Sequence, residues 1–144
     1  MKNLIFSILF LGSIGLSAQS IVGTWKTIDD ETGKEKSVVE IYEKSGKYYG
    51  KVIKLFRGPD EDPDPICDEC DKKDPRYNQK VIGMEIIQDM EFDKSDNEYE
   101  EGTILDPANG SVYDCKLWVE DGNLKVRGYI MFLYRTQTWL PYKG

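Results

Sequence analysis

Two cysteines separated by two residues, Cys67 and Cys70, are the first candidates for chemistry in this chain of 144 residues. The spacing admits three interpretations: a redox-active pair, part of a zinc site, or a local disulfide. Redox catalysis requires a thiol of depressed pKa, whereas neighbouring acids such as Asp68 and Glu69 raise it. Zinc takes four ligands, and the chain has no histidine and one other cysteine. We therefore favour a structural disulfide, which adds at most about 2 kcal/mol of stability.

The third cysteine, Cys115, lies in the alternating segment 113–119, where every second residue is apolar. This placement predicts a buried and inert core residue. The acidic stretch 60–64 offers oxygen ligands of the kind that calcium prefers, but it lacks the spacing of a defined calcium loop. We interpret it as solvated surface and expect no metal and no cofactor.

Composition excludes several function classes. Without histidine there is no Ser-His-Asp or Cys-His nucleophile pair, no imidazole ligand and no imidazole proton shuttle. The chain has 19 basic and 26 acidic residues, for a net charge of −7. An acidic chain is a poor ligand for nucleic acid or anionic membranes, which select basic surfaces. We expect neither nucleic-acid binding nor a stable membrane anchor.

The first 18 residues have the layout of a secretory signal peptide. Lys2 gives a positive start, segment 4–11 is almost wholly apolar, and Ala18 precedes the expected cleavage point. The apolar stretch is shorter than the roughly 20 residues that span a bilayer. We predict that residues 1–18 are removed and that residues 19–144 form a single domain. The protein is then periplasmic or secreted.

Beyond this segment, turn residues separate short runs rich in Val, Ile, Tyr and Trp, which favour strands. We predict eight strands, near residues 21–28, 37–43, 47–56, 82–92, 98–105, 111–119, 123–132 and 135–140. Short connections between alternating strands favour an all-β fold, an eight-stranded up-and-down antiparallel barrel, because closure removes exposed edges. A two-sheet sandwich is the alternative.

One segment breaks the rhythm of hairpins. Residues 57–79 are rich in Pro and Asp, carry no apolar periodicity, and separate the third and fourth strands. Connections of this length are usually functional or disordered. We expect this acidic loop to lie across one mouth of the barrel.

The first and last strands of such a barrel pair with each other. Trp25 lies on the first strand, Arg127 on the seventh and Arg135 on the last. An arginine that stacks on Trp25 would plug that end, in a contact of about 0.5–2 kcal/mol. The sequence does not distinguish Arg127 from Arg135 in this role.

A set of motifs now supports a family resemblance. It comprises Gly23-Thr24-Trp25, the segments 39–42 and 46–52, Cys67-x-x-Cys70, Gly102, the segment 106–113, and the segments 124–129 and 135–139. Together they resemble the bacterial family called domain of unknown function 2147, small exported proteins with a lipocalin-like architecture, over nearly all of residues 21–140. The resemblance implies a fold more than an activity: the family has no established reaction, and lipocalin-like barrels commonly hold small apolar molecules. Trp25 with Arg127 or Arg135 would match the barrel-closing pair. Family members often turn before the last strand with a glycine; segment 132–135 has none, so a bulge there is expected instead.

Three functional hypotheses follow. The first is an exported barrel that binds a small apolar or amphipathic ligand in its interior. Its candidate ligand-binding residues are Trp25, Tyr42, Tyr49, Tyr113, Tyr129, Arg127 and Arg135. The second is a structural or interaction module of the cell envelope that uses the acidic loop 57–79. An enzyme is the third and least favoured, since no spaced constellation of carboxylates stands out, and we expect no catalysis.

Overall fold

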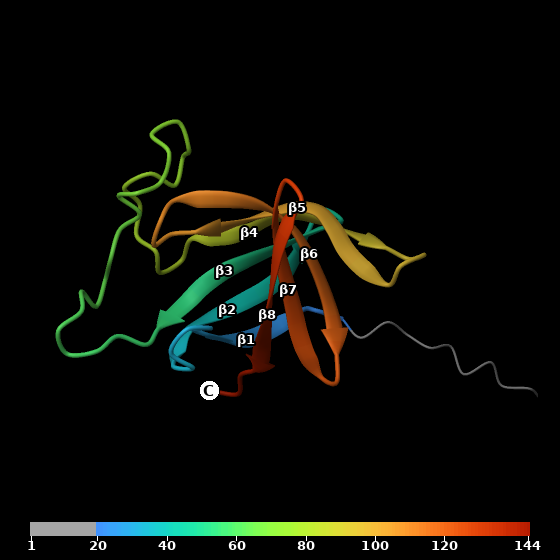
Figure 1. The fold of residues 1–144 in the computed structure, drawn as a ribbon, viewed down its shortest axis with the longest axis horizontal. Helices are drawn as coiled ribbons and strands as arrows, with labels where there is room; N and C mark the ends of the chain where they lie inside the picture. Colours follow the sequence, from blue (N-terminus) through green and yellow to red (C-terminus); the bar gives the residue numbers. More distant parts are fainter. Residues whose placement is uncertain (1–19) are drawn as a thin grey trace, which may run out of the picture.

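The computed structural model describes residues 20–144, so the predicted signal peptide lies outside the described residues. Eight antiparallel strands follow one another round a closed barrel, each paired with its neighbours in sequence (Figure 1). They are β1 (Gly23–Ile28), β2 (Glu35–Lys44), β3 (Lys47–Leu55), β4 (Glu85–Asp93), β5 (Glu98–Asp106), β6 (Ser111–Glu120), β7 (Asn123–Ile130) and β8 (Leu133–Pro141). The predicted up-and-down barrel is confirmed, and the sandwich is excluded.

Closure depends on a short seam between β1 and β8. Trp25 pairs with Pro141 and Lys26 with Leu140. Beyond these pairs, the Thr24 hydroxyl donates to the carbonyl of Tyr142 at 2.7 Å, and the Tyr142 amide donates to the Thr24 carbonyl at 3.0 Å. The seam therefore joins the two ends of the chain with a few hydrogen bonds.

The fourth strand begins later than predicted. Residues 81–84 form a turn in which the Gly83 amide donates to the carbonyl of Val52, and the Val52 amide donates to that of Met84. These bonds fix the turn on β3, so the extended backbone of β4 starts only at Glu85.

The last hairpin also differs from the prediction. β7 and β8 pair in unbroken register as far as Ile130 and Leu133, and a two-residue turn joins them. The expected bulge is therefore wrong. Met131 adopts a φ of 54° in this turn, a conformation that favours glycine or asparagine.

The core fills the end of the barrel that carries the β2–β3, β4–β5 and β6–β7 turns. Its fully buried side chains include Ile21, Val39, Ile41, Ile87, Met90, Leu117 and Leu124. Cys115 is buried among them as predicted, and this burial raises the pKa of its thiol to about 12, which leaves it protonated and inert. Gly102 permits close packing here, because a Cβ at this position would lie 2.3 Å from the Gln88 carbonyl oxygen.

The long connection between β3 and β4 reaches away from the barrel (Figure 1) and contains the Cys67–Cys70 disulfide, as predicted. Both cysteines are buried because the disulfide loop packs on the β5–β6 turn. Gly110 makes this contact possible: its φ is +75°, and a Cβ would lie 1.8 Å from the carbonyl oxygen of Glu69.

A second contact ties this connection to the barrel. The guanidinium of Arg76 makes two bonds to the carboxylate of Asp74, at 2.8 and 3.0 Å, and donates a third to the backbone carbonyl of Glu85 at 2.9 Å. The bonds from Arg76 hold the pKa of Asp74 below its usual value. This Asp74–Arg76 clasp anchors the connection at the start of β4. Within residues 20–144, no helix has the length and apolar character of a membrane crossing.

Candidate ligand cavity

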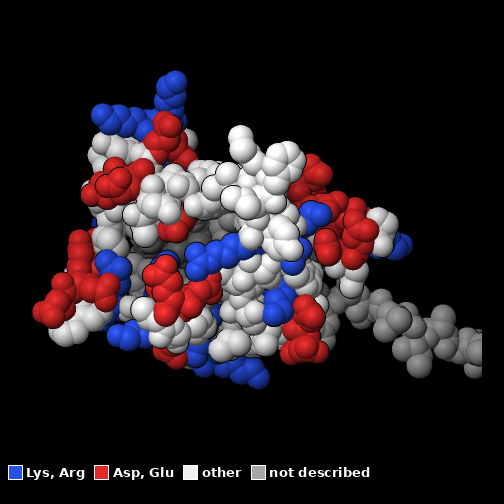
Figure 2. Space-filling view, in the orientation of Figure 1, with Lys and Arg blue, Asp and Glu red and all other residues white. Residues whose placement is uncertain are grey.

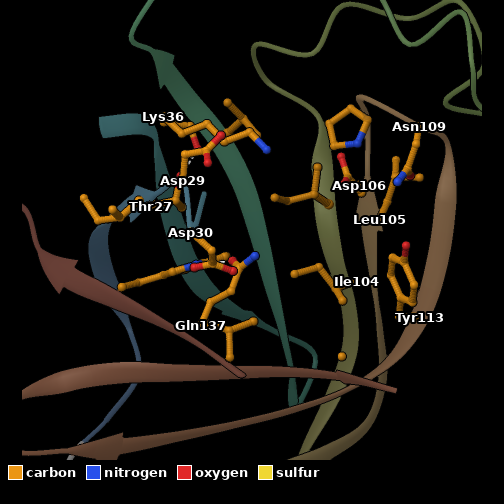
Figure 3. A pocket seen from close by; sticks show the side chains of 18 of the residues that line it. Thr27, Asp29, Asp30, Lys36, Ile104, Leu105, Asp106, Asn109, Tyr113 and Gln137 are labelled. Atoms are coloured by element: carbon orange, nitrogen blue, oxygen red, sulfur yellow. Dashed lines mark hydrogen bonds between the residues drawn. The ribbon is translucent and has the colours of Figure 1, made fainter. Parts of the chain in front are cut away.

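A cavity of about 480 Å³ opens at the end of the barrel opposite the filled core. The β1–β2, β5–β6 and β7–β8 turns lie at this end, and Figure 3 shows side chains from both sides pointing into the space between them. A volume of this size lies within the roughly 300–1,000 Å³ of small-molecule sites. The acidic loop 57–79 was predicted to lie across the mouth, but it lies beside it. Among the described residues, none of those that line the cavity belongs to this loop.

The interior of the cavity is apolar. Its walls are formed by Val52, Leu55, Val81, Ile86, Ile104, Leu105 and Val126, with Tyr113 and Trp139 as the aromatic contributions. Trp139 is 2 % exposed and separates the cavity from the filled core. Such a surface gains free energy by excluding water in favour of an apolar molecule.

Three polar side chains interrupt this wall. Thr27 and Ser37 are buried and their hydroxyls form a hydrogen bond of 2.6 Å across β1 and β2. Gln137 accepts a bond from the indole nitrogen of Trp139 at 3.0 Å, which orients its amide toward the cavity (Figure 3). The two hydroxyls are therefore partners of each other, and the Gln137 side-chain oxygen has the Trp139 indole as its donor.

Charges of both signs surround the mouth, and Figure 2 shows a hollow with acidic and basic side chains at its edge. Arg135 and Asp30 form an ion pair of 2.8 Å across the mouth, linking β8 to the β1–β2 turn. Asp29 accepts the backbone amides of Thr32 and Glu31, and these bonds lower the pKa of its carboxyl. The rim can therefore hold a polar or charged group while the interior holds an apolar one.

The structure places only two of the seven predicted ligand-binding residues in the cavity wall. Tyr113 and Arg135 line the cavity. The other five do not line it: Trp25, Tyr42, Tyr49, Tyr129 and Arg127. The prediction of these five residues as part of the wall is thus corrected. The reason is the alternation of each strand, which turns Tyr42, Tyr49 and Tyr129 to the outer face.

The outward tyrosines of β2 and β3 form a cluster of their own. The rings of Tyr42 and Tyr49 stack with centroids 6.0 Å apart, and their hydroxyls donate to Glu85 and Asp89 respectively. Desolvation and the Glu85 carboxylate raise the pKa of the Tyr42 phenol. These contacts stabilise the outer face of the β2–β4 sheet.

The two arginines have partners other than Trp25. Arg127 lies over the rings of Trp118 and Tyr134, at 4.8 and 4.4 Å, and Arg135 pairs with Asp30 at the mouth. The indole nitrogen of Trp25 instead donates to the carbonyl of Ile21 at 2.8 Å. The expected plug of arginine on Trp25 is wrong, and the segment that enters β1 covers this tryptophan.

Most of the cavity wall was not predicted from the sequence. Thr27 follows Trp25 at a spacing of two, and Ser37 precedes Val39 at the same spacing, so each shares the inward face of its strand. A polar residue at an inward position was the signal that could have identified this pair. Gln137 carries the same signal, two residues before inward Trp139, whereas Ile104 carries none because inward apolar residues also occur in filled cores.

An eight-stranded antiparallel barrel with an apolar cavity at one end and charges at its mouth defines a lipocalin-like protein. Among solved structures, the chain is similar to protein HP1028 from the human pathogen Helicobacter pylori, described as belonging to the lipocalin family; the TM-score is 0.70 and the identity 19 %, over 86 % of this chain and 84 % of that one. No curated protein matches the chain. The model of a bacterial family, "Uncharacterized protein conserved in bacteria (DUF2147)", matches residues 23–140. The chain belongs to this family.

Proposed function

We propose that this protein binds one small amphipathic molecule in its barrel, with the apolar part inside and a polar group at the rim. The observation that carries the proposal is the cavity of about 480 Å³, apolar within and charged at its mouth. The lipocalin-like fold supports it, because an eight-stranded barrel is wide enough for one small ligand. We infer binding and not catalysis.

A substitution that places a larger side chain in the cavity tests this proposal. Gly128 lines the wall, and a Cβ there would meet its nearest neighbour, Tyr113, at 3.5 Å, which leaves room for a larger side chain. Gly128→Leu should occupy the cavity and reduce the fluorescence of a bound apolar probe, N-phenyl-1-naphthylamine, by about tenfold. Thr136→Leu adds bulk to the exposed outer face of β8 and should leave the signal unchanged.

Native mass spectrometry of the protein after mild purification provides the second measurement. A retained small molecule in the wild type and its loss in Gly128→Leu support the proposal. Absence of probe fluorescence in the wild type, or equal fluorescence in wild type and Gly128→Leu, would contradict it.

Export is part of the same proposal and rests on residues 1–18 of the sequence. A barrel that carries amphipathic molecules in the periplasm or outside the cell would act where such molecules cannot cross water alone. Intact-mass analysis of the protein from a periplasmic or secreted fraction should give a chain that starts at Gln19. A full-length chain confined to the cytoplasm would contradict this part.

The alternative, an interaction module built on the acidic loop, has less support. Several of the loop's acids are engaged within the chain: Asp64 pairs with Lys80 at 2.9 Å and Glu61 with Arg57 at 3.4 Å. Asp62 accepts the backbone amide of Asp64 at 2.9 Å. These contacts shape the loop itself and leave fewer free charges for a cationic partner.

A further inference from the structure

The tip of the β7–β8 hairpin, residues 130–134, carries five consecutive apolar or aromatic side chains that are exposed to solvent. Met131 is 92 % exposed, Phe132 98 % and Leu133 77 %. The other exposed large apolar side chains of the described residues are isolated along the chain: Val22, Ile53, Ile66, Ile82, Phe92 and Val112. A contiguous apolar patch on a protein surface commonly marks an interaction site.

The sequence maintains this hairpin tip at a conformational cost. The two-residue turn places Met131 at a φ of 54°, where Asn or Gly is favoured and a long side chain is strained. Neither Met131 nor Phe132 packs into the core, so the barrel gains no burial from them. Stability of the folded barrel therefore does not explain the large apolar side chains of the turn, and contact with another molecule would.

Aromatic rings and the guanidinium of Arg127 lie at the base of the hairpin tip, on the outer face of the barrel. The rings of Tyr129 and Tyr134 are 5.9 Å apart, and Arg127 lies over both Tyr134 and Trp118. Tyrosine, tryptophan and arginine have an apolar body and a polar end, and they concentrate at the boundary between lipid and water. An apolar tip that enters the lipid, followed by amphipathic side chains at the level of the headgroups, is the arrangement expected of a segment that inserts into a membrane surface.

The hairpin tip also stands at the mouth of the cavity, since Gly128 on β7 and Arg135 on β8 line the cavity and flank the tip. In Figure 2 an uncharged projection rises where Figure 1 shows the β7–β8 turn, next to the hollow. The rim carries both signs of charge, with the basic residues Lys36 and Arg135 beside the acidic residues Asp29, Asp30, Glu31 and Asp106. This mixture complements the phosphate and ammonium groups of zwitterionic headgroups, whereas the net charge of −7 opposes an anionic surface.

We propose that the hairpin tip inserts reversibly into a bilayer of zwitterionic phospholipid, with the cavity mouth facing the lipid. A deformable lipid surface can contact all the side chains of a projecting turn, whereas a protein partner would need a matching groove. The docking is independent of the cavity's occupant, so it can succeed or fail separately from the proposed ligand binding.

Flotation with vesicles of phosphatidylcholine and phosphatidylethanolamine tests the proposal. The wild type should float with the vesicles, and the double variant Met131→Asp, Phe132→Asp should lose at least about tenfold in binding, because two apolar side chains no longer enter the lipid. Val22→Asp makes the same kind of change at an exposed apolar residue on the opposite end of the barrel and should float like the wild type. Addition of anionic phosphatidylglycerol should weaken binding of the wild type.

A variant with an added tryptophan at the tip measures how deeply the tip enters the bilayer. Phe132→Trp should show fluorescence quenched by lipids brominated near the headgroup, beyond the quenching of the wild type. Failure of the wild type to float, equal flotation of the double variant, or no added quenching in Phe132→Trp would overturn the proposal. A wild type that stays off vesicles but dimerises through the tip, as shown by a monomeric double variant in light scattering, would replace the bilayer with a second copy of the chain.

Discussion

The two ends of this barrel are built from the same eight strands and stabilised in different ways. At the end with the β2–β3, β4–β5 and β6–β7 turns, Trp25 and the side chains around it fill the interior. At the other end, the interior is left open as a cavity, and contacts among the connections shape the rim. Packing therefore determines the stability of the filled end, whereas a disulfide, a glycine and an ion pair organise the open end.

The largest expected effect is on the filled end. Trp25→Ala removes a side chain that is 7 % exposed and should lower the free energy of unfolding by about 3–5 kcal/mol. Tyr113→Ala at the open end should cost less than about 2 kcal/mol, because half-buried Tyr113 already borders empty space. Urea unfolding measures both; equal losses would contradict the difference between the ends.

The contact between the disulfide loop and the β5–β6 turn should show the next largest effect. Gly110→Ala introduces a Cβ against the Glu69 carbonyl at a φ of +75° and should cost about 2–4 kcal/mol. Gly122→Ala is the matched control, with a φ of +78° and no atom within 4 Å of the new Cβ, so about 1 kcal/mol of backbone strain is expected. Thermal unfolding compares the two, and an equal loss would show that the loop contact is unimportant.

The Asp74–Arg76 clasp should make the rim sensitive to pH. The pKa of Asp74 is lowered in the folded state, so its contribution is present above the unfolded pKa of about 3.9 and is lost as the pH falls through the folded value. Asp74→Asn should cost about 1.5–3 kcal/mol at pH 7. The difference from wild type should shrink below pH 4. A constant difference between pH 7 and pH 3 in urea unfolding would contradict this origin.

The disulfide should have the smallest effect. Its loop encloses few residues, and the double variant Cys67→Ala, Cys70→Ala should lose at most about 2 kcal/mol. Hydrogen exchange should accelerate in the connection 57–79 and the β5–β6 turn, while the amides around Trp25 keep their protection. Faster exchange at both ends would show that the ends are not independent.

The strands were predictable from sequence because alternation and turn residues are local signals. The same alternation also predicts the orientation of the tyrosines. Tyr42 lies two residues after Glu40, which faces outward, and Tyr129 lies two residues after Arg127, so each pair shares the outer face. The alternation of each strand is therefore sufficient to place both tyrosines on the outer face. Which end is hollow could not be predicted, because the volume left inside depends on which side chains face each other across the closed barrel.

The seam between β1 and β8 has a consequence for how the chain folds. The hydrogen bond from Thr24 to Tyr142 spans 118 residues. β1 can therefore pair with β8, its second neighbour, only after almost all of the chain has been synthesised. Until then both terminal strands present open hydrogen-bonding edges, which are templates for aggregation. Loss of the last five residues would remove the β8 partners of Trp25 and Lys26 and leave those edges unpaired. A chaperone that shields the edges during synthesis would have its largest effect just before Pro141 and Tyr142 are made.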